Sequence, residues 1–213
     1  MYNVAQENPM SDDERKFIYQ KVYDIMKEAI EAGIYEANYI LGLMYLNGFY
    51  TAKNNLKAFY YFSIAASYSH GMAYYQLYKI LKEDKLIIYK DNEDSVKKLA
   101  LFDYLSRSAE EGYLEAMHEL GNHYISGNLR KKNYLKALAW HRHACRNGYI
   151  LSYEPCGDIF YNGGHGIKKN KALSLVMYYS AYTNGIKDVK EKVLRVTDEL
   201  REEGEPIPEM VLV

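Results

Sequence analysis

Four histidines and one cysteine fall close together in the sequence, and they are the residues with the clearest potential for chemistry. His118 and His123 lie in the segment H-E-L-G-N-H, which looks like the H-E-x-x-H motif of zinc hydrolases. That motif needs two histidines four residues apart on one helix face. These two are five residues apart, which turns one about 140° away from the other around a helix. The spacing therefore excludes the zinc-hydrolase motif.

A metal site of another kind stays open as an alternative. His141 and His143 are two residues apart, so a helix would point them to different sides, and Cys145 follows them. A metal-binding protein or enzyme would have to gather residues from two helices. Its ligands would come from this set: His118, His123, His141, His143 and Cys145. Separate packing or surface roles are the simpler interpretation, and we expect no cofactor and no bound metal.

Other catalytic signatures are absent from the sequence. It contains no G-x-S-x-G, no phosphate-binding P-loop and no G-x-G-x-x-G. The G-G-H-G segment at 163–166 follows a predicted helix rather than a strand, so we interpret it as an inter-helix loop. We therefore name no catalytic residue and do not expect an enzyme.

The elements that would position these side chains are set by an internal repeat. Five similar segments are centred on glycines at intervals of 38, 41, 36 and 37 residues. These glycines are Gly33, Gly71, Gly112, Gly148 and Gly185. A period of this size indicates stacked pairs of helices, each of which buries its apolar face only against its neighbours. We therefore predict an all-α protein that binds partners rather than catalyses a reaction.

Each glycine is expected to end one helix and open the next, because glycine adopts positive φ without strain. Capping signals support the boundaries: Ser11 with Glu14 forms a capping box, and Asn in the K-N-N-L-K-A and K-N-Y-L-K-A loops caps the returning helix. Proline is tolerated only in the first turn of a helix, so the helix that contains Pro155 should begin near Ser152 or kink. The predicted helices are 12–32, 34–47, 55–69, 71–84, 95–111, 113–126, 134–147, 152–162, 170–184 and 187–203.

A second glycine follows nine residues after the first in three of the repeats, at Gly42, Gly121 and Gly157. Glycine inside a helix costs about 1 kcal/mol against alanine, so its recurrence needs a physical reason. Close approach of the partner helix is the reason that we predict. The second repeat has Ile80 at this place.

The order of these residues resembles the Sel1-like repeat, a relative of the tetratricopeptide repeat. The pattern A-x-x-x-L-G-x-x-Y-x-x-G fits both 37–48 and 116–127, and a Lys-Ala pair recurs at 57–58, 136–137 and 171–172. The resemblance covers about residues 25–190 and implies a right-handed α-solenoid of stacked antiparallel helix pairs, commonly with an adaptor or assembly role. We expect a flexible segment over 1–11, one solenoid over 12–204, and an extended apolar tail over 205–213. That tail either inserts into a partner or folds back over the last helix.

One candidate binding face comes from the first helix of each pair. Core contacts are expected four, eight and twelve residues after the leading glycine, which leaves positions six and ten for a concave, partner-binding face. The alternative is that Tyr39 and Leu43 pack under the N-terminal helix through Phe17, Ile18 or Val22. The face comprises Tyr39, Leu43, Leu77, Leu81, His118, Asn122, Glu154 and Asp158.

A second candidate surface is a basic edge. Residues 120–187 carry 10 basic and only two acidic side chains, although the whole chain has a net charge of −1. An acidic protein segment or an anionic headgroup would dock there, whereas a merely solvated edge is the alternative. Nucleic acid is not expected, because aromatic residues are not interleaved with the basic ones. The edge comprises Arg130, Lys131, Lys132, Lys168 and Lys169, in equivalent loops of adjacent repeats.

Composition completes the expectations. The 24 tyrosines favour half-buried, partner-binding helix surfaces, although a codon bias would also explain them. With two cysteines, no transmembrane run and no targeting signal, we expect a cytoplasmic protein, or a mitochondrial one without a recognisable presequence. The leading functional hypothesis is a non-catalytic protein–protein interaction scaffold or adaptor. A permanent accessory subunit of a large complex is the second hypothesis, and the metal protein is the third.

Overall fold

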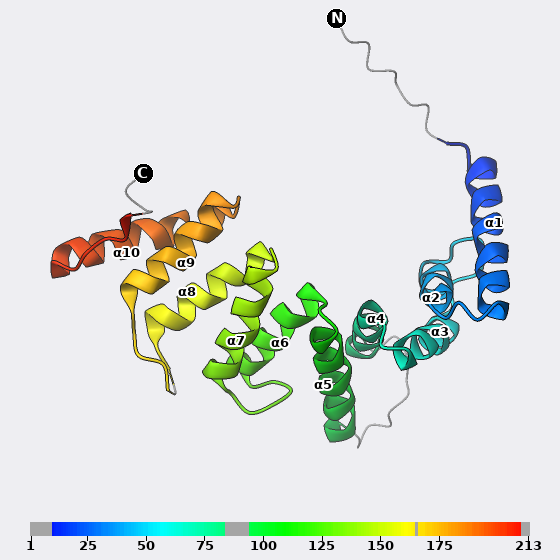
Figure 1. The fold of residues 1–213 in the computed structure, drawn as a ribbon, viewed down its shortest axis with the longest axis horizontal. Helices are drawn as coiled ribbons and strands as arrows, with labels where there is room; N and C mark the ends of the chain where they lie inside the picture. The colour runs from blue at the N-terminus through cyan, green and yellow to red at the C-terminus, as the bar shows by residue number, and fades with distance from the viewer. Residues whose placement is uncertain (1–9, 84–93, 165, 210–213) are drawn as a thin grey trace, which may run out of the picture. The chain divides into compact units, whose positions relative to one another are not determined.

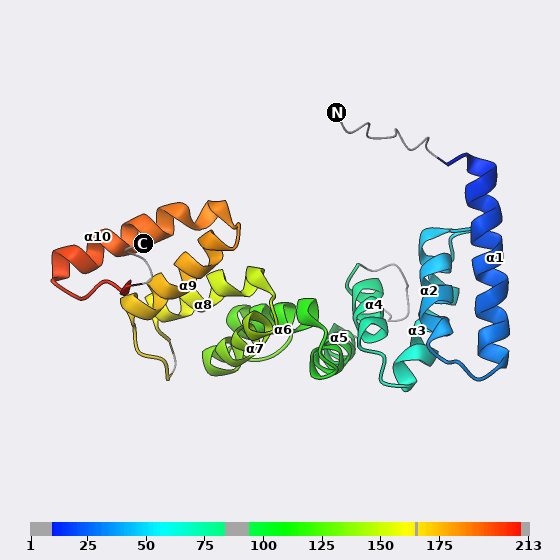
Figure 2. The same ribbon diagram turned by 45° about the horizontal axis from the view of Figure 1, so that its top comes forward.

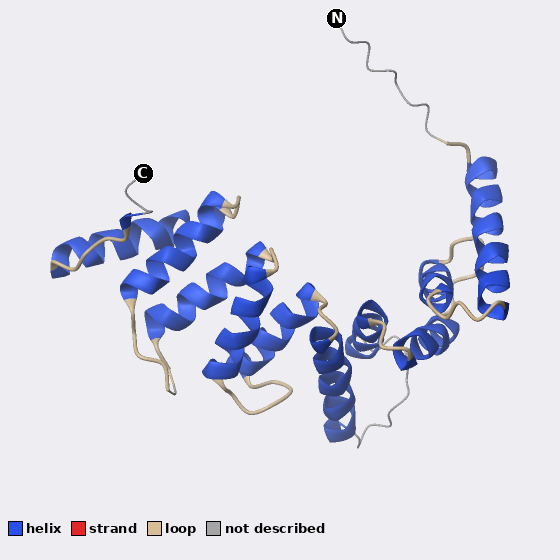
Figure 3. Cartoon of the chain, viewed as in Figure 1, coloured by secondary structure: helices blue, strands red, loops and turns tan. Residues whose placement is uncertain are grey.

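The computed structural model describes residues 10–83, 94–164 and 166–209, and over these residues the chain is helical (Figure 1). The helices belong to two compact units, Met1–Ile88 and Tyr89–Val213. Within the described ranges the structure contains no strand, only an isolated bridge between Gly164 and Ile167 (Figure 3). The predicted all-α class is therefore confirmed, while a single solenoid over 12–204 stays a prediction. Most of the segment expected to be flexible over 1–11 lies outside the described residues.

Within each unit, every helix packs against the next one along the chain (Figure 2). The first unit holds α1 (Asp12–Glu31), α2 (Ala37–Asn47), α3 (Asn55–Ser67) and α4 (Gly71–Lys82). The second holds α5 (Asp94–Glu110), α6 (Leu114–Ser126), α7 (Tyr134–Arg146), α8 (Tyr153–Asn162), α9 (Lys171–Thr183) and α10 (Lys190–Glu203), with short 3₁₀ turns at Ile150–Ser152 and Lys187–Val189. Where both ends are described, the predicted bounds agree to within three residues.

Side-chain caps begin the helices as the sequence predicted. Ser11 and Glu14 form the capping box of α1. The side-chain oxygens of Asn54 and Asn133 each accept a hydrogen bond from the backbone N–H three residues later, at 2.9 Å. Asn170 caps α9 in the same way at 2.8 Å. A cap of this kind stabilises a helix by about 1 kcal/mol, so the returning helix of each pair has a fixed start.

The end of α3 corrects the repeat register. Ser69, with φ 60°, is the left-handed residue there, and Gly71 is instead the first residue of α4. In every repeat the residue after the left-handed one donates its N–H to the carbonyl five residues earlier, as His70 does to Ala65 at 3.4 Å. The intervals between turn residues are then 36, 43, 36 and 37. The turn residues are Gly33, Ser69, Gly112, Gly148 and Gly185.

The second glycine of each repeat faces an aromatic ring of the returning helix. A Cβ built on Gly42 would lie 2.5 Å from Phe62 Cε1, and on Gly157 it would lie 2.4 Å from Tyr178 Cε1. On Gly121 it would lie 2.5 Å from Nε2 of the His141 ring. The predicted close approach is therefore confirmed in three helix pairs. In the corrected register Tyr78, not Ile80, stands at the glycine position of α4.

The tail turns back over the last helices. Ile207 packs against the buried cluster that α9 and α10 form together. Of the two alternatives for the tail, the structure shows folding back for the residues it describes, and 210–213 lie outside them. The cluster consists of Leu175, Tyr178, Val196 and Leu200.

The Gly42 contact generates a prediction about stability. Gly42→Ala would press a methyl group into the Phe62 ring, and we expect it to lower the free energy of unfolding by about 1–3 kcal/mol. Adding Phe62→Leu should recover part of this loss, so a double-mutant cycle followed by urea denaturation and circular dichroism should show favourable coupling.

Gly33→Ala is the matched control. No atom lies within 4 Å of its Cβ, so its cost comes from a φ of 84° alone and should be independent of Phe62. Equal coupling of both alanines to residue 62 would contradict the close-approach explanation.

Candidate interaction surfaces

Two of the eight residues of the predicted concave face are in the core. Leu77 and Leu81 are each 1% exposed, so the expectation that they face a partner is wrong. The physical reason is the register of the repeat, which starts at Ser69 rather than at Gly71. Leu77 and Leu81 are therefore eight and twelve residues after the turn residue, which are core positions. Leu41 and Tyr45 occupy the same positions in the preceding repeat. Tyr75 and Lys79 occupy positions six and ten instead.

Tyr39 and Leu43 are half-buried. The Tyr39 ring stacks on His70 at 4.5 Å between centroids and tilts against Phe62 at 5.7 Å. Those contacts go to α3 and to the N-cap of α4, not to the N-terminal helix. Phe17 and Ile18 are 58% and 45% exposed, whereas Val22 is half-buried, so packing under the N-terminal helix stays a prediction for Val22.

His118 and Asn122 belong to a polar chain in the second unit. The His118 ring lies within hydrogen-bond distance of Asn122 Nδ2 (3.0 Å, from Nε2) and of Ser152 Oγ (2.9 Å, from Nδ1). Ser152 Oγ in turn lies 3.3 Å from His141 Nδ1. Ser152 and His141 are fully buried, and among the described residues His141 Nε2 has no hydrogen-bond partner.

Burial controls the charge of both histidines. It lowers the pKa of His141 to about 3, with the neighbouring His118 as a second cause, and it also lowers the pKa of His118. Both rings are therefore neutral at pH 7. The equivalent residues of the first unit are Tyr39, Phe62 and Ala73, so three packing positions have become polar together.

Glu154 and Asp158 are occupied by an internal contact. Lys192 of α10 lies 2.9 Å from a Glu154 oxygen and 2.7 Å from Asp158 Oδ1, which also accepts a hydrogen bond from the Tyr178 hydroxyl. This acidic pair therefore attaches α10 to α8. Their sequence positions alone gave no sign of Lys192 as a partner, because it lies 34 residues further along the chain than Asp158.

The structure does not bring together the five residues of the alternative metal site. The rings of His118 and His141 lie 5.1 Å apart, but His143 is exposed and lies parallel to the Trp140 ring. Cys145 lies instead beside Cys156. Over the part of the chain that is described, no three His, Cys, Asp or Glu side chains are arranged to hold a metal ion.

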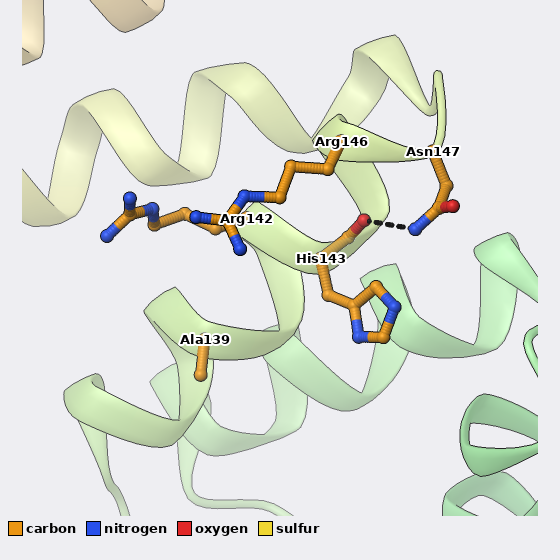
Figure 4. A pocket seen from close by; sticks show the side chains of 5 residues that line it. All are labelled: Ala139, Arg142, His143, Arg146 and Asn147. Carbon is orange, nitrogen blue, oxygen red and sulfur yellow. Dashed lines mark hydrogen bonds between the residues drawn. The ribbon is translucent and has the colours of Figure 1, made fainter.

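His143 lines a shallow pocket of about 440 Å³ on α7 (Figure 4). Arg142 and Arg146 extend along one side of the helix, while His143 points to the other. Within the described ranges neither arginine forms an ion pair with a carboxylate. The sequence analysis missed this pair, although the i, i+4 spacing of two arginines was available as a signal.

The two loops of the basic edge lie side by side. Gly164 and Gly166 pack on Tyr134 and Leu135 at the start of α7, which brings the α8–α9 loop against the end of the α6–α7 loop. All five basic residues are exposed, and in the described part of the chain none of them pairs with a carboxylate. Arg130 lies over the Phe102 ring, 4.3 Å from its centroid.

The largest feature that the sequence analysis missed is in the first unit. Every large aromatic side chain that is strongly exposed among the described residues belongs to it. Such side chains in one region usually mark an interface. They are Phe17, Tyr35, Phe49, Tyr50, Tyr60 and Tyr68.

These observations define an all-α protein built from helical pairs with a glycine–ring contact. Residues 36–67, 114–149 and 156–186 match the family model of the Sel1 repeat, and the chain is a Sel1-repeat protein. Sel1 repeats generally mediate protein–protein interaction. Among the described residues, no helix combines the length and apolar character needed to cross a bilayer.

Two solved structures share the fold. A protective antigen of uropathogenic Escherichia coli with an SLR fold matches at a TM-score of 0.72 and 22% identity, over 91% of this chain and 41% of that one. A Sel1 repeat protein from Oxalobacter formigenes matches at 0.68 and 20% identity, over 92% and 78%. At these identities the likeness concerns the fold alone.

The neutral, buried His141 predicts a pH dependence. Its pKa is lower in the folded state than the unfolded value of about 6.5, so folding loses stability as the pH falls from about 6.5 toward 3. His141→Phe, which copies Phe62 of the first unit, should remove about 2–3 kcal/mol of the stability difference between pH 7 and pH 4.5. Urea denaturation at both pH values measures it.

His143→Gln is the control, because that ring is exposed and should leave the pH dependence unchanged. An unaltered pH dependence in His141→Phe would show that His141 is not the group that titrates.

Proposed function

We propose that this chain is a non-catalytic scaffold or adaptor that binds other proteins. The observation that carries the proposal is the concentration of exposed aromatic side chains in the first unit. Tyrosine, phenylalanine and methionine supply large contact areas and are enriched at protein interfaces. The repeat family supports the general role, and the two surfaces below are specific to this chain.

The strongest anchor is a tyrosine pair. Tyr35 and Tyr68 stack at 3.9 Å between centroids, with ring planes 8° apart, although they are 41% and 54% exposed. Their hydroxyls are hydrogen-bonded, which holds the pKa of Tyr68 above its usual value. Ile34 and Met72 adjoin the same two turns and are also exposed. Rings held in this way lose little conformational entropy on binding, so they suit an interface anchor.

The basic edge of the second unit is the second surface that we propose. Its five cations have no carboxylate partner among the described residues, and an acidic segment of a partner protein complements them. A permanent accessory subunit of a large complex remains the alternative role, in the cytoplasm or in the mitochondrion. A permanent subunit would co-purify stoichiometrically through high salt, whereas a transient adaptor would be washed away.

Loss of the tyrosine pair should weaken binding without unfolding the protein. We expect Tyr35→Ser/Tyr68→Ser to reduce recovery of the protein partners captured by the wild type at least about tenfold, as for interface anchors of 1.4 kcal/mol or more. Quantitative mass spectrometry of affinity-captured material measures this, and thermal unfolding checks the fold.

The matched control removes two exposed apolar side chains of the second unit, Leu151→Ser/Leu194→Ser, which are 50% and 55% exposed. Equal recovery of the partners by both double variants would contradict the aromatic surface. So would a fall in thermal stability as large as that of the core variant Leu41→Ala.

Charge reversal should separate the basic edge from the aromatic surface. Lys131→Glu/Lys168→Glu should slow association with the captured partner and weaken its dependence on salt, since exposed charges act mainly on the association rate. Its stability should change little. Surface plasmon resonance at low and physiological salt measures both effects.

Lys16→Glu/Lys27→Glu on α1 changes the net charge equally and is the control. If the two reversals act alike, or if neither changes the rate, the basic edge is only a solvated surface.

A further inference from the structure

The two cysteines of this chain meet inside the second unit. Cys145 lies in the last turn of α7 and Cys156 in the first turns of α8, and these two helices pack against each other. Cys156 is fully buried and Cys145 is 9% exposed. The two thiols are close enough to interact, and each shifts the pKa of the other. A chain with only two cysteines has therefore placed both at one contact.

The repeat shows that packing does not require cysteine at either place. Counted from the turn residues, Cys145 corresponds to Ala66 and Ala109, and Cys156 corresponds to Leu77 and Leu120. All four of these residues are at most 3% exposed. At these two turns an alanine and a leucine fill the positions, whereas the first turn has Ile30 with Leu41 and the last has Tyr182 with Val193; a pair of thiols occurs only here. Alanine and leucine also provide the replacements that the fold already accepts.

The surroundings make the two thiols unequal. The interaction with Cys156 holds the pKa of Cys145 below its usual value, although burial opposes this. The interaction with Cys145 and burial both raise the pKa of Cys156, and the nearby Arg142 offsets only part of that rise. Cys145 is therefore the thiol that ionises first and is also the more accessible, as a reacting cysteine must be.

We propose that Cys145 and Cys156 form a reversible dithiol–disulfide site that hydrogen peroxide oxidises and a small dithiol reduces. The Cys145 thiolate attacks one peroxide oxygen, the O–O bond breaks, and the leaving hydroxide takes up a proton to become water. The Cys156 sulfur then attacks the resulting sulfenic acid: the S–S bond forms, the S–O bond breaks, and the thiol proton leaves with the hydroxide as a second water. Two thiols lose two electrons in total, and one peroxide becomes two waters.

The bond would tie the end of one helical pair to the start of the next. It joins α7 to α8 and closes the short loop 145–156, which contains the turn at Gly148 and the buried Ser152. This site is independent of the scaffold role, since neither cysteine belongs to the proposed binding surfaces.

The test treats the folded protein with hydrogen peroxide at neutral pH, followed by alkylation in denaturant and peptide mass spectrometry. We expect a linked Cys145–Cys156 peptide two hydrogens lighter than the reduced pair, reversed by dithiothreitol, with an unchanged far-ultraviolet circular dichroism spectrum. Cys156→Leu should leave Cys145 to be trapped as a sulfenic acid by dimedone. Cys145→Ala should leave Cys156 unoxidised.

Several results would overturn the site. Recovery of both alkylated cysteines, under conditions that fully oxidise glutathione, would show that the folded pair does not react. A sulfinic acid at Cys145 without a linked peptide would show that the sulfurs cannot meet. Linkage that appears only in urea, or only between two chains, would place the chemistry outside the folded monomer.

Discussion

The distance between the two helices of a pair depends on a ring placed against a glycine. Gly42, Gly121 and Gly157 each leave room for the ring of Phe62, His141 or Tyr178, and any Cβ would overlap that ring. The glycine weakens its own helix by about 1 kcal/mol, and burial of a whole aromatic side chain offsets this loss.

The glycine–ring contact requires a flat ring opposite the glycine but does not require that this ring be apolar. His141 fills the space of an aromatic ring, and its polar atoms then require partners in a place where the other repeats are apolar. Ser152 Oγ is the partner of His141 Nδ1 and also lies within hydrogen-bond distance of His118; the corresponding positions of the first unit hold Ala73 and Tyr39. The unpaired Nε2 of His141 shows that this requirement is only half met. A buried polar group with one free nitrogen favours the neutral ring, which explains why burial dominates its pKa.

Much of the fold could be predicted from local signals, because the atoms of a cap lie within one turn of the chain. The recurring glycines predicted a close approach of the two helices, although the ring that each glycine contacts lies about 20 residues further along the chain. Asn54, Asn133 and the capping box of Ser11 are cases where the responsible atoms are three residues apart. The register of the second repeat could not be predicted in the same way. A glycine at 71 suggested the turn, whereas the chain placed Ser69 in the left-handed conformation and accepted its strain of about 1 kcal/mol or more. Because the turn lies two residues earlier than predicted, Leu77 and Leu81 lie in the core, although we expected them on the surface.

Of the two proposed binding surfaces, the basic edge could be predicted from the sequence and the aromatic surface could not. The reason is what determines the exposure of each kind of side chain. Charge is visible in the sequence, since a lysine run such as 131–132 has no apolar core to enter and stays in solvent. Exposure of a tyrosine is not visible, because the same residue serves as a core ring at Tyr178 and as a surface ring at Tyr68. Only the packing of α1 to α4 reveals that this unit buries Phe62 and Tyr78 but leaves six of its other aromatic side chains exposed. Apolar surface holds a partner once it has docked, whereas charge speeds its approach. Under the proposed function, the exposed aromatic side chains of the first unit would set the residence time of a partner, and the basic edge of the second unit would set its association rate.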